Sequence, residues 1–163
     1  MKSKAAVGML LFSFFSHGSC QKDEHRQFDF WLGQWQVVRD DGQLAGSNQI
    51  TKGYNGCVIK ERYQAVSGFH GESVNIFDVT TGRWHQTWVD SSRLLLQLQG
   101  GWEDGAMVLQ GDRQNLQGVK IQDKITWRVN RDGSVRQLWQ TKVADGDWQI
   151  TFDGHYQRQH QSQ

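Results

Sequence analysis

Five polar residues alternate with large aromatic residues, at a spacing of two positions. They are Glu61, Asn75, Gln86, Asp90 and Gln137. The aromatic residues two positions away from them are Tyr63, Phe77, Trp88 and Trp139. Because alternate side chains of a β-strand point to the same face, these polar and aromatic groups are predicted to share one inner face. Burying an amide or a carboxylate is costly unless it is paired, so each polar group on this face needs a partner.

Three interpretations of this face are open. In the first, the nine residues line a lumen that binds a small molecule, which is amphiphilic, hydrophobic or sugar-like. In the second, the polar groups satisfy one another, and the chain is a structural module with a packed core. In the third, the chain is an enzyme in which buried Glu61 acts as a general acid or base. A lumen smaller than about 300 Å³ would favour the packed core.

Other chemistry finds little support in the sequence. Neither a Gly-x-Ser-x-Gly motif nor a Cys beside a His marks a nucleophile, which weighs against an enzyme. We predict no metal site and no cofactor, since Cys57 has no suitably spaced Cys or His. A haem ligand would need an inward His, and His155 falls on the outer face unless a bulge turns it. With 18 basic and 17 acidic residues, no charge excess favours nucleic acid as a partner.

Ten short segments of alternating side chains, each stopped by a turn signal, carry these residues. They cover residues 33–39, 45–52, 57–66, 72–78, 83–90, 93–99, 106–112, 121–129, 134–143 and 148–157. Residues 24–32 have the spacing of one or two helical turns. A meander of this kind closes into an up-and-down barrel or forms a sandwich. The chain contains no Pro, which suits a closed barrel because every strand must donate its N–H groups.

In the last segment, alternation places Trp148, Ile150 and Phe152 on the inner face together with Tyr156. The same alternation puts His155 and Asp153 outside. The inner face of the closing strand is therefore predicted to be almost entirely aromatic and aliphatic.

The first nineteen residues have the pattern of a signal peptide. Lys2 and Lys4 precede an apolar run over residues 5–15, which is too short for a permanent membrane span. Small residues then lead to Cys20, as in bacterial lipoprotein signals, where that Cys becomes the lipidated N-terminus. Cleavage after Gly18 is the competing interpretation, and Cys20 could then form a disulfide with Cys57.

Several motifs resemble a bacterial lipocalin-like family of the calycin superfamily that carries no assigned activity. The motifs are residues 28–35 (FDFWLGQW), 56–61, 75–78, 84–91 (WHQTWVDS), 125–127, 132–139 (DGSVRQLW) and 152–158 (FDGHYQR). Gly33 and Trp35 at the first strand, with Arg158 at the last, look like the calycin signature. There an Arg guanidinium lies over a Trp face and closes the barrel end.

The resemblance implies an all-β protein, a single antiparallel up-and-down calycin-like β-barrel of about ten strands with a short N-terminal helix. The expected organisation is a signal peptide (1–19), an anchor or linker (20–27), the barrel domain (28–158) and a tail (159–163). We expect a chain exported to the cell envelope or periplasm and anchored to the membrane by lipid on Cys20. Its expected partner is a small-molecule ligand in the lumen.

Overall fold

The computed structural model describes residues 20–159. The predicted signal peptide over residues 1–19 and the tail from residue 160 onward lie outside the described residues. Within the described part, no helix is long and apolar enough to cross a membrane.

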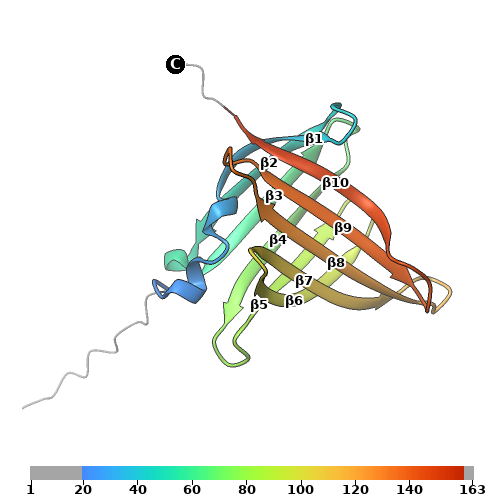
Figure 1. Cartoon of the computed structure of the whole chain (residues 1–163). Coiled ribbons are helices and arrows are strands. Elements are labelled where there is room, and N and C mark those ends of the chain that lie inside the picture. The colour runs from blue at the N-terminus through green and yellow to red at the C-terminus, as the bar shows by residue number, and fades with distance from the viewer. Residues whose placement is uncertain (1–19, 160–163) are drawn as a thin grey trace, which may run out of the picture.

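Ten antiparallel strands form one closed barrel in which each strand pairs with its neighbours in the sequence and β1 pairs with β10 (Figure 1). The strands are β1 (Gly33–Arg39), β2 (Leu44–Gly53), β3 (Val58–Ala65), β4 (His70–Asp78), β5 (Arg83–Asp90), β6 (Leu95–Glu103), β7 (Ala106–Gln114), β8 (Lys120–Val129), β9 (Val135–Val143) and β10 (Gln149–Arg158). This confirms the predicted all-β up-and-down barrel. The sandwich left open by the turn pattern is excluded, since the first and last strands are hydrogen-bonded to each other.

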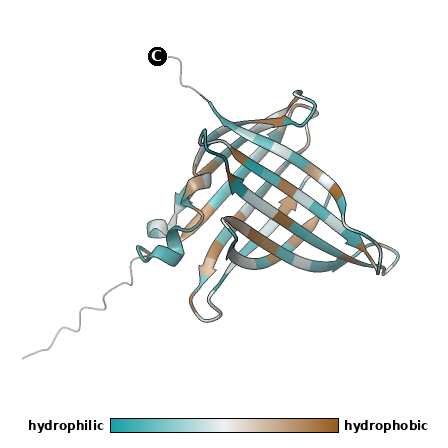
Figure 2. Ribbon diagram, viewed as in Figure 1, coloured by the Kyte–Doolittle hydropathy of each residue, from teal (hydrophilic) through white to brown (hydrophobic). Residues whose placement is uncertain are grey.

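Alternating side chains determine which face of each strand is inside the barrel, as the banded colouring of the strands in Figure 2 illustrates. Along β8, Asp123, Ile125 and Trp127 are buried, whereas the residues between them are more exposed. Burial of one apolar face provides the main driving force for closing such a sheet.

The inward orientation predicted for Trp148 and Ile150 is wrong. The pairing of β10 with β9 shifts between Ile150 and Phe152, so Thr151 is an extra residue in β10. Such a bulge reverses the alternation on one side of it. Ile150 is consequently 63% exposed, and Trp148 lies on the outer surface with Lys124 Nζ 4.4 Å from its ring centroid.

Two short 3₁₀ turns, η1 (Asp23–Arg26) and η2 (Asp29–Trp31), precede β1 and lie across one end of the barrel (Figure 1). They confirm the predicted short N-terminal helix, in the tighter 3₁₀ form. Phe28 and Trp31 are fully buried and contact Trp127, at ring-centroid distances of 5.1 and 5.4 Å. Trp84 packs edge-on against Phe28. We call this the closed end, defined by the buried residues Phe28, Trp31, Trp35, Trp84 and Trp127.

Gly33, Trp35 and Arg158 meet at the closed end, where β1 pairs with β10. The Arg158 guanidinium lies 4.4 Å from the Trp35 ring centroid, and its Nη1 donates to the carbonyl oxygen of Leu32 at 3.2 Å. Gly33 has a φ of +136°, and a Cβ atom there would lie 2.7 Å from Arg158 Nη1. The backbone conformation therefore favours glycine, and a Cβ atom there would displace the guanidinium group.

A disulfide joins Cys20 to Cys57, which follows the short turn η3 (Tyr54–Gly56). It ties the N-terminal segment to the loop between β2 and β3. Lipid attachment would need the same Cys20 sulfur atom, so one molecule cannot have both modifications. Of the two states left open for Cys20 by the sequence, the structure contains the disulfide.

Candidate functional site

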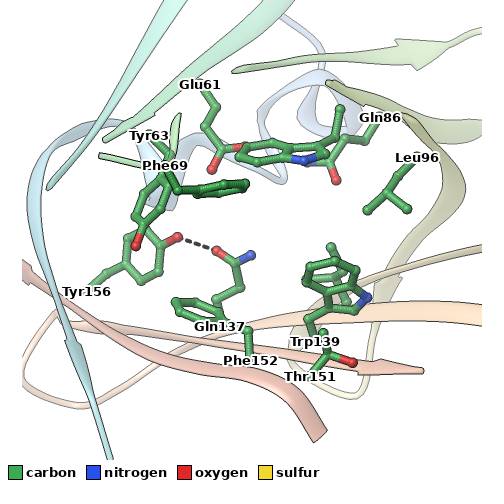
Figure 3. A pocket seen from close by; sticks show the side chains of 12 residues that line it. Glu61, Tyr63, Phe69, Gln86, Leu96, Gln137, Trp139, Thr151, Phe152 and Tyr156 are labelled. Atoms are coloured by element: carbon green, nitrogen blue, oxygen red, sulfur yellow. Dashed lines mark hydrogen bonds between the residues drawn. The ribbon is translucent and has the colours of Figure 1, made fainter. Parts of the chain in front are cut away.

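A cavity of about 180 Å³ lies inside the barrel at the end opposite the closed end. Its walls are Glu61, Tyr63, Phe69, Gln86, Trp88, Leu96, Ile125, Gln137, Trp139, Thr151, Phe152 and Tyr156 (Figure 3). Several of the lining aromatic side chains, including Tyr63, Trp88 and Trp139, are partly exposed, so solvent reaches the cavity from this side. We call this the open end, bordered by the loops at residues 66–69, 91–94 and 144–148.

Six of the nine predicted ligand-binding residues line this one cavity. They are Glu61, Tyr63, Gln86, Trp88, Gln137 and Trp139. The other three lie elsewhere. Asn75 is fully buried beside Gln86 of the neighbouring strand, Phe77 packs against His25 and Trp84 near the closed end, and Asp90 lies at the end of β5.

Among residues 20–159, Glu61 is the only carboxyl group that lines the cavity, and it is held by two neutral donors. Asn48 Nδ2 donates to Oε1 at 2.7 Å, and Ser73 Oγ donates to Oε2 at 2.6 Å. Cross-strand pairing brings these groups together, because Glu61 lies opposite Ser73 in β4. Both oxygen atoms keep a further acceptor position for a ligand.

Burial raises the pKa of Glu61 to about 7, although the hydrogen bonds from Ser73 and Asn48 oppose the shift. Burial and the charge of Glu61 also raise the pKa values of Tyr63 and Tyr156, and the shift of Tyr156 is the larger. Both phenols therefore stay neutral at physiological pH, while Glu61 titrates there.

Three further hydrogen bonds extend the polar layer around Glu61. Gln86 Nε2 donates to Asn75 Oδ1 at 2.9 Å, and Asn75 Nδ2 donates to Ser73 Oγ at 2.9 Å. On the opposite wall, the Tyr156 hydroxyl donates to Gln137 Oε1, as the dashed line in Figure 3 shows. The polar groups of the inner face thus largely satisfy one another, as the second interpretation expected. They do so beside a cavity rather than inside a filled core.

The two cavity tryptophans donate their indole N–H groups to carboxylates. Trp88 Nε1 donates to Asp90 Oδ2 at 2.8 Å, and Trp139 Nε1 donates to Asp123 Oδ1 at 2.9 Å. Arg113 also binds Asp123, at 2.7 Å. Burial alone would raise the pKa of Asp90, but hydrogen bonds from Ser92 and Trp88 leave that pKa below its usual value. Each indole ring is therefore fixed in place with a carboxylate at its edge.

Sequence reasoning did not single out several residues of the site. Leu96, Ile125, Phe152 and Tyr156 have the inward parity of the predicted strands but look like ordinary core residues. Asn48 has inward parity in β2, and a search for polar residues at such positions would have found it. Phe69 lies in a loop, and Thr151 reaches the cavity through the bulge, so alternation has no signal for either.

The arrangement can accept a proton near neutral pH, but it offers no evident nucleophile. Ser73 is the hydroxyl group nearest the Glu61 carboxylate, yet it is 2% exposed and does not line the cavity. His155 lies beside Asp153 on the outer surface, with Nε2 4.0 Å from Oδ1. Over residues 20–159, no three His, Cys, Asp or Glu side chains are grouped to hold a metal ion.

No family model matches the chain, and no curated protein is similar to it in sequence. The fold and the site define a closed, ten-strand, antiparallel up-and-down β-barrel, which is compatible with a calycin-like fold. One end is filled with aromatic side chains, and the other contains a small cavity with a buried carboxyl group.

Proposed function

We propose that the barrel binds a small molecule in the cavity at its open end. The observation that carries the proposal is the cavity itself, where Glu61 lies among aromatic walls that solvent can reach. Internal packing would fill this space if the barrel served only as a structural module, as it does around Trp31 and Trp127 at the closed end.

The volume limits the ligand to about one ring. An apolar cavity of about 150 Å³ holds benzene, and ordinary ligand pockets begin at about 300 Å³. The observed 180 Å³ is below the volume at which an ordinary ligand pocket would be favoured over a packed core, and it has room only for a single ring with a short polar substituent. Long-chain lipids and quinones, which are among the larger amphiphilic or hydrophobic molecules, are too large for it.

Two leucines in β6 provide a matched test. Leu96 lines the cavity and is 3% exposed, whereas its neighbour Leu95 faces outward and is 51% exposed. We expect Leu96→Phe to fill the cavity and weaken binding of benzyl alcohol at least about tenfold, while Leu95→Phe leaves it unchanged. Titration of tryptophan fluorescence measures both. Equal binding by the two variants would place the ligand elsewhere.

The kinship with the lipocalin-like family is also a proposal. It is supported by the stacking of Arg158 on Trp35, with Gly33 beside them at the point where β1 and β10 close the barrel. In such a family the barrel provides the scaffold, and the side chains inside it determine the ligand.

We propose in addition that the chain is exported to the cell envelope. The charged and apolar pattern of residues 1–19 supports this, and so does the Cys20–Cys57 disulfide, since disulfides persist in oxidising compartments. Intact mass measurement of the protein from its host envelope, without reduction, tests it. A chain cleaved before Cys20 with both thiols oxidised is expected. Added lipid mass would instead establish the anchored form, and retention of residues 1–19 would contradict export.

A further inference from the structure

The cavity combines one acidic group with an absence of basic groups in its walls. Glu61 is the only acidic residue among the 12 lining residues of the described chain, and none of them is Lys, Arg or His. Its hydrogen-bond partners, Asn48 and Ser73, are uncharged. An ionised Glu61 therefore has no countercharge inside the cavity, which makes the site unfavourable for an anion and favourable for a cation.

The rest of the wall is rich in aromatic rings, which attract cations through their electron-rich faces. Six of the lining residues are aromatic, namely Tyr63, Phe69, Trp88, Trp139, Phe152 and Tyr156. Figure 3 shows Tyr63, Phe69, Phe152 and Tyr156 on one side of the cavity and Trp139 across from them. Glu61 therefore shares the cavity with these six rings.

The hydrogen bonds of the two indole groups also favour a cation over an anion. Asp90 accepts a hydrogen bond from Trp88, and Asp123, whose charge is paired with Arg113, accepts one from Trp139, so both indole N–H donors are occupied. The two indole N–H groups are therefore not available to donate hydrogen bonds to an anionic ligand. Gly71 allows the Trp88 ring to lie against β4, since a Cβ atom there would be 2.3 Å from Cζ2.

We propose that the cavity selects a small organic cation, a primary ammonium group on a single apolar ring, with the ammonium at Glu61 and the ring against the aromatic wall. This rests on the proposed function, because it identifies the chemical class of ligand for the same cavity. The ammonium supplies the countercharge that Glu61 lacks, and its N–H groups fit the free acceptor positions of the carboxylate.

Three probes of nearly equal shape and different charge test the selection. Benzylamine, benzyl alcohol and benzoate are titrated into the wild-type protein at pH 8 by calorimetry. We expect benzylamine to bind at least about tenfold more tightly than benzyl alcohol, and benzoate to bind most weakly. If benzyl alcohol or benzoate binds as tightly as benzylamine, the cation proposal fails and the proposed function stands. If none of the three binds, the proposed function fails as well.

The variant Glu61→Gln keeps the shape of the side chain and removes its charge. We expect its affinity for benzylamine to fall to within about twofold of its affinity for benzyl alcohol, both measured on the same variant. An unaltered preference for benzylamine would overturn the role of Glu61. Circular dichroism confirms that the variant is folded.

The pH dependence of benzylamine binding to the wild-type protein tests the proposal even if that variant does not fold. Glu61 titrates with a pKa of about 7, while the titratable groups that face it, Tyr63 and Tyr156, stay neutral. A primary ammonium remains protonated from pH 6 to pH 8, so its affinity should rise about tenfold over this range as Glu61 ionises. Benzyl alcohol serves as the control. Equal affinity for benzylamine at both pH values would contradict the proposal.

Discussion

The closed end and the open end are built from the same strands and from similar aromatic residues, yet they pack differently. At the closed end, Trp35 and Trp127 are fully buried, and two 3₁₀ turns add Phe28 and Trp31 to the stack. At the open end, Trp88 and Trp139 are held by carboxylates instead of other rings and border a cavity. The aromatic content of a barrel therefore does not decide whether it is filled. The covering N-terminal segment and the position of the polar layer decide it.

The same substitution at each end should show the largest difference. Removing a fully buried tryptophan leaves a cavity, and we expect Trp127→Ala to lower the free energy of unfolding by about 4 kcal/mol. Trp139 is partly exposed and already borders a cavity, so we expect Trp139→Ala to cost less than about 2 kcal/mol. Urea unfolding followed by far-ultraviolet circular dichroism compares them. Equal losses would mean that both ends are packed alike.

The polar layer between the two ends should make stability depend on pH. Glu61 has a pKa of about 7 in the folded protein against an ordinary value of 4.5. The folded state therefore binds this proton more tightly than the unfolded state. The contribution of Glu61 to the free energy of unfolding is fully present below pH 4.5 and is lost as the pH rises to about 7. The loss amounts to about 3 kcal/mol. Comparing unfolding of the wild type with that of Glu61→Gln isolates this contribution. An unchanged slope in the variant would assign the effect to other groups.

The smallest effect is expected where the closed end is sealed. The Arg158 side chain is exposed, so we expect its stacking on Trp35 to contribute little to the free energy of unfolding. We expect Arg158→Met, which keeps much of the apolar stem, to lower the free energy of unfolding by about 1 kcal/mol and to leave ligand binding unchanged. Thermal unfolding and the benzyl alcohol titration measure the two quantities. A loss of binding would show that the ends are coupled.

The fold could be predicted from the sequence because turns and alternation are local signals. Ten alternating segments, each stopped by a turn signal, indicated a meander, and the absence of Pro favoured its closure into a barrel. Alternation failed at Thr151, where one extra residue turned Trp148 and Ile150 outward. A bulge depends on pairing with β9, and the sequence of β10 alone has no signal for it.

The site could be predicted only in part. Parity identified which side chains point inward, and six of the nine chosen residues share the cavity. It did not give their height along the barrel, so Phe77 was grouped with residues of the other end. It also did not show that Asn75 is buried in hydrogen bonds with Gln86 and Ser73 instead of lining the cavity, because that depends on contacts between neighbouring strands.

The indole N–H signals in a nitrogen–hydrogen correlation spectrum test the central claim most directly, because the chain has 8 tryptophans distributed over both ends and the outer surface. Titration with benzylamine at pH 8 should shift the signals of Trp88 and Trp139. The signals of Trp31, Trp35, Trp84 and Trp127 should stay in place. Shifts confined to those four, or no shifts in any indole signal at saturating probe, would contradict a ligand site at the open end.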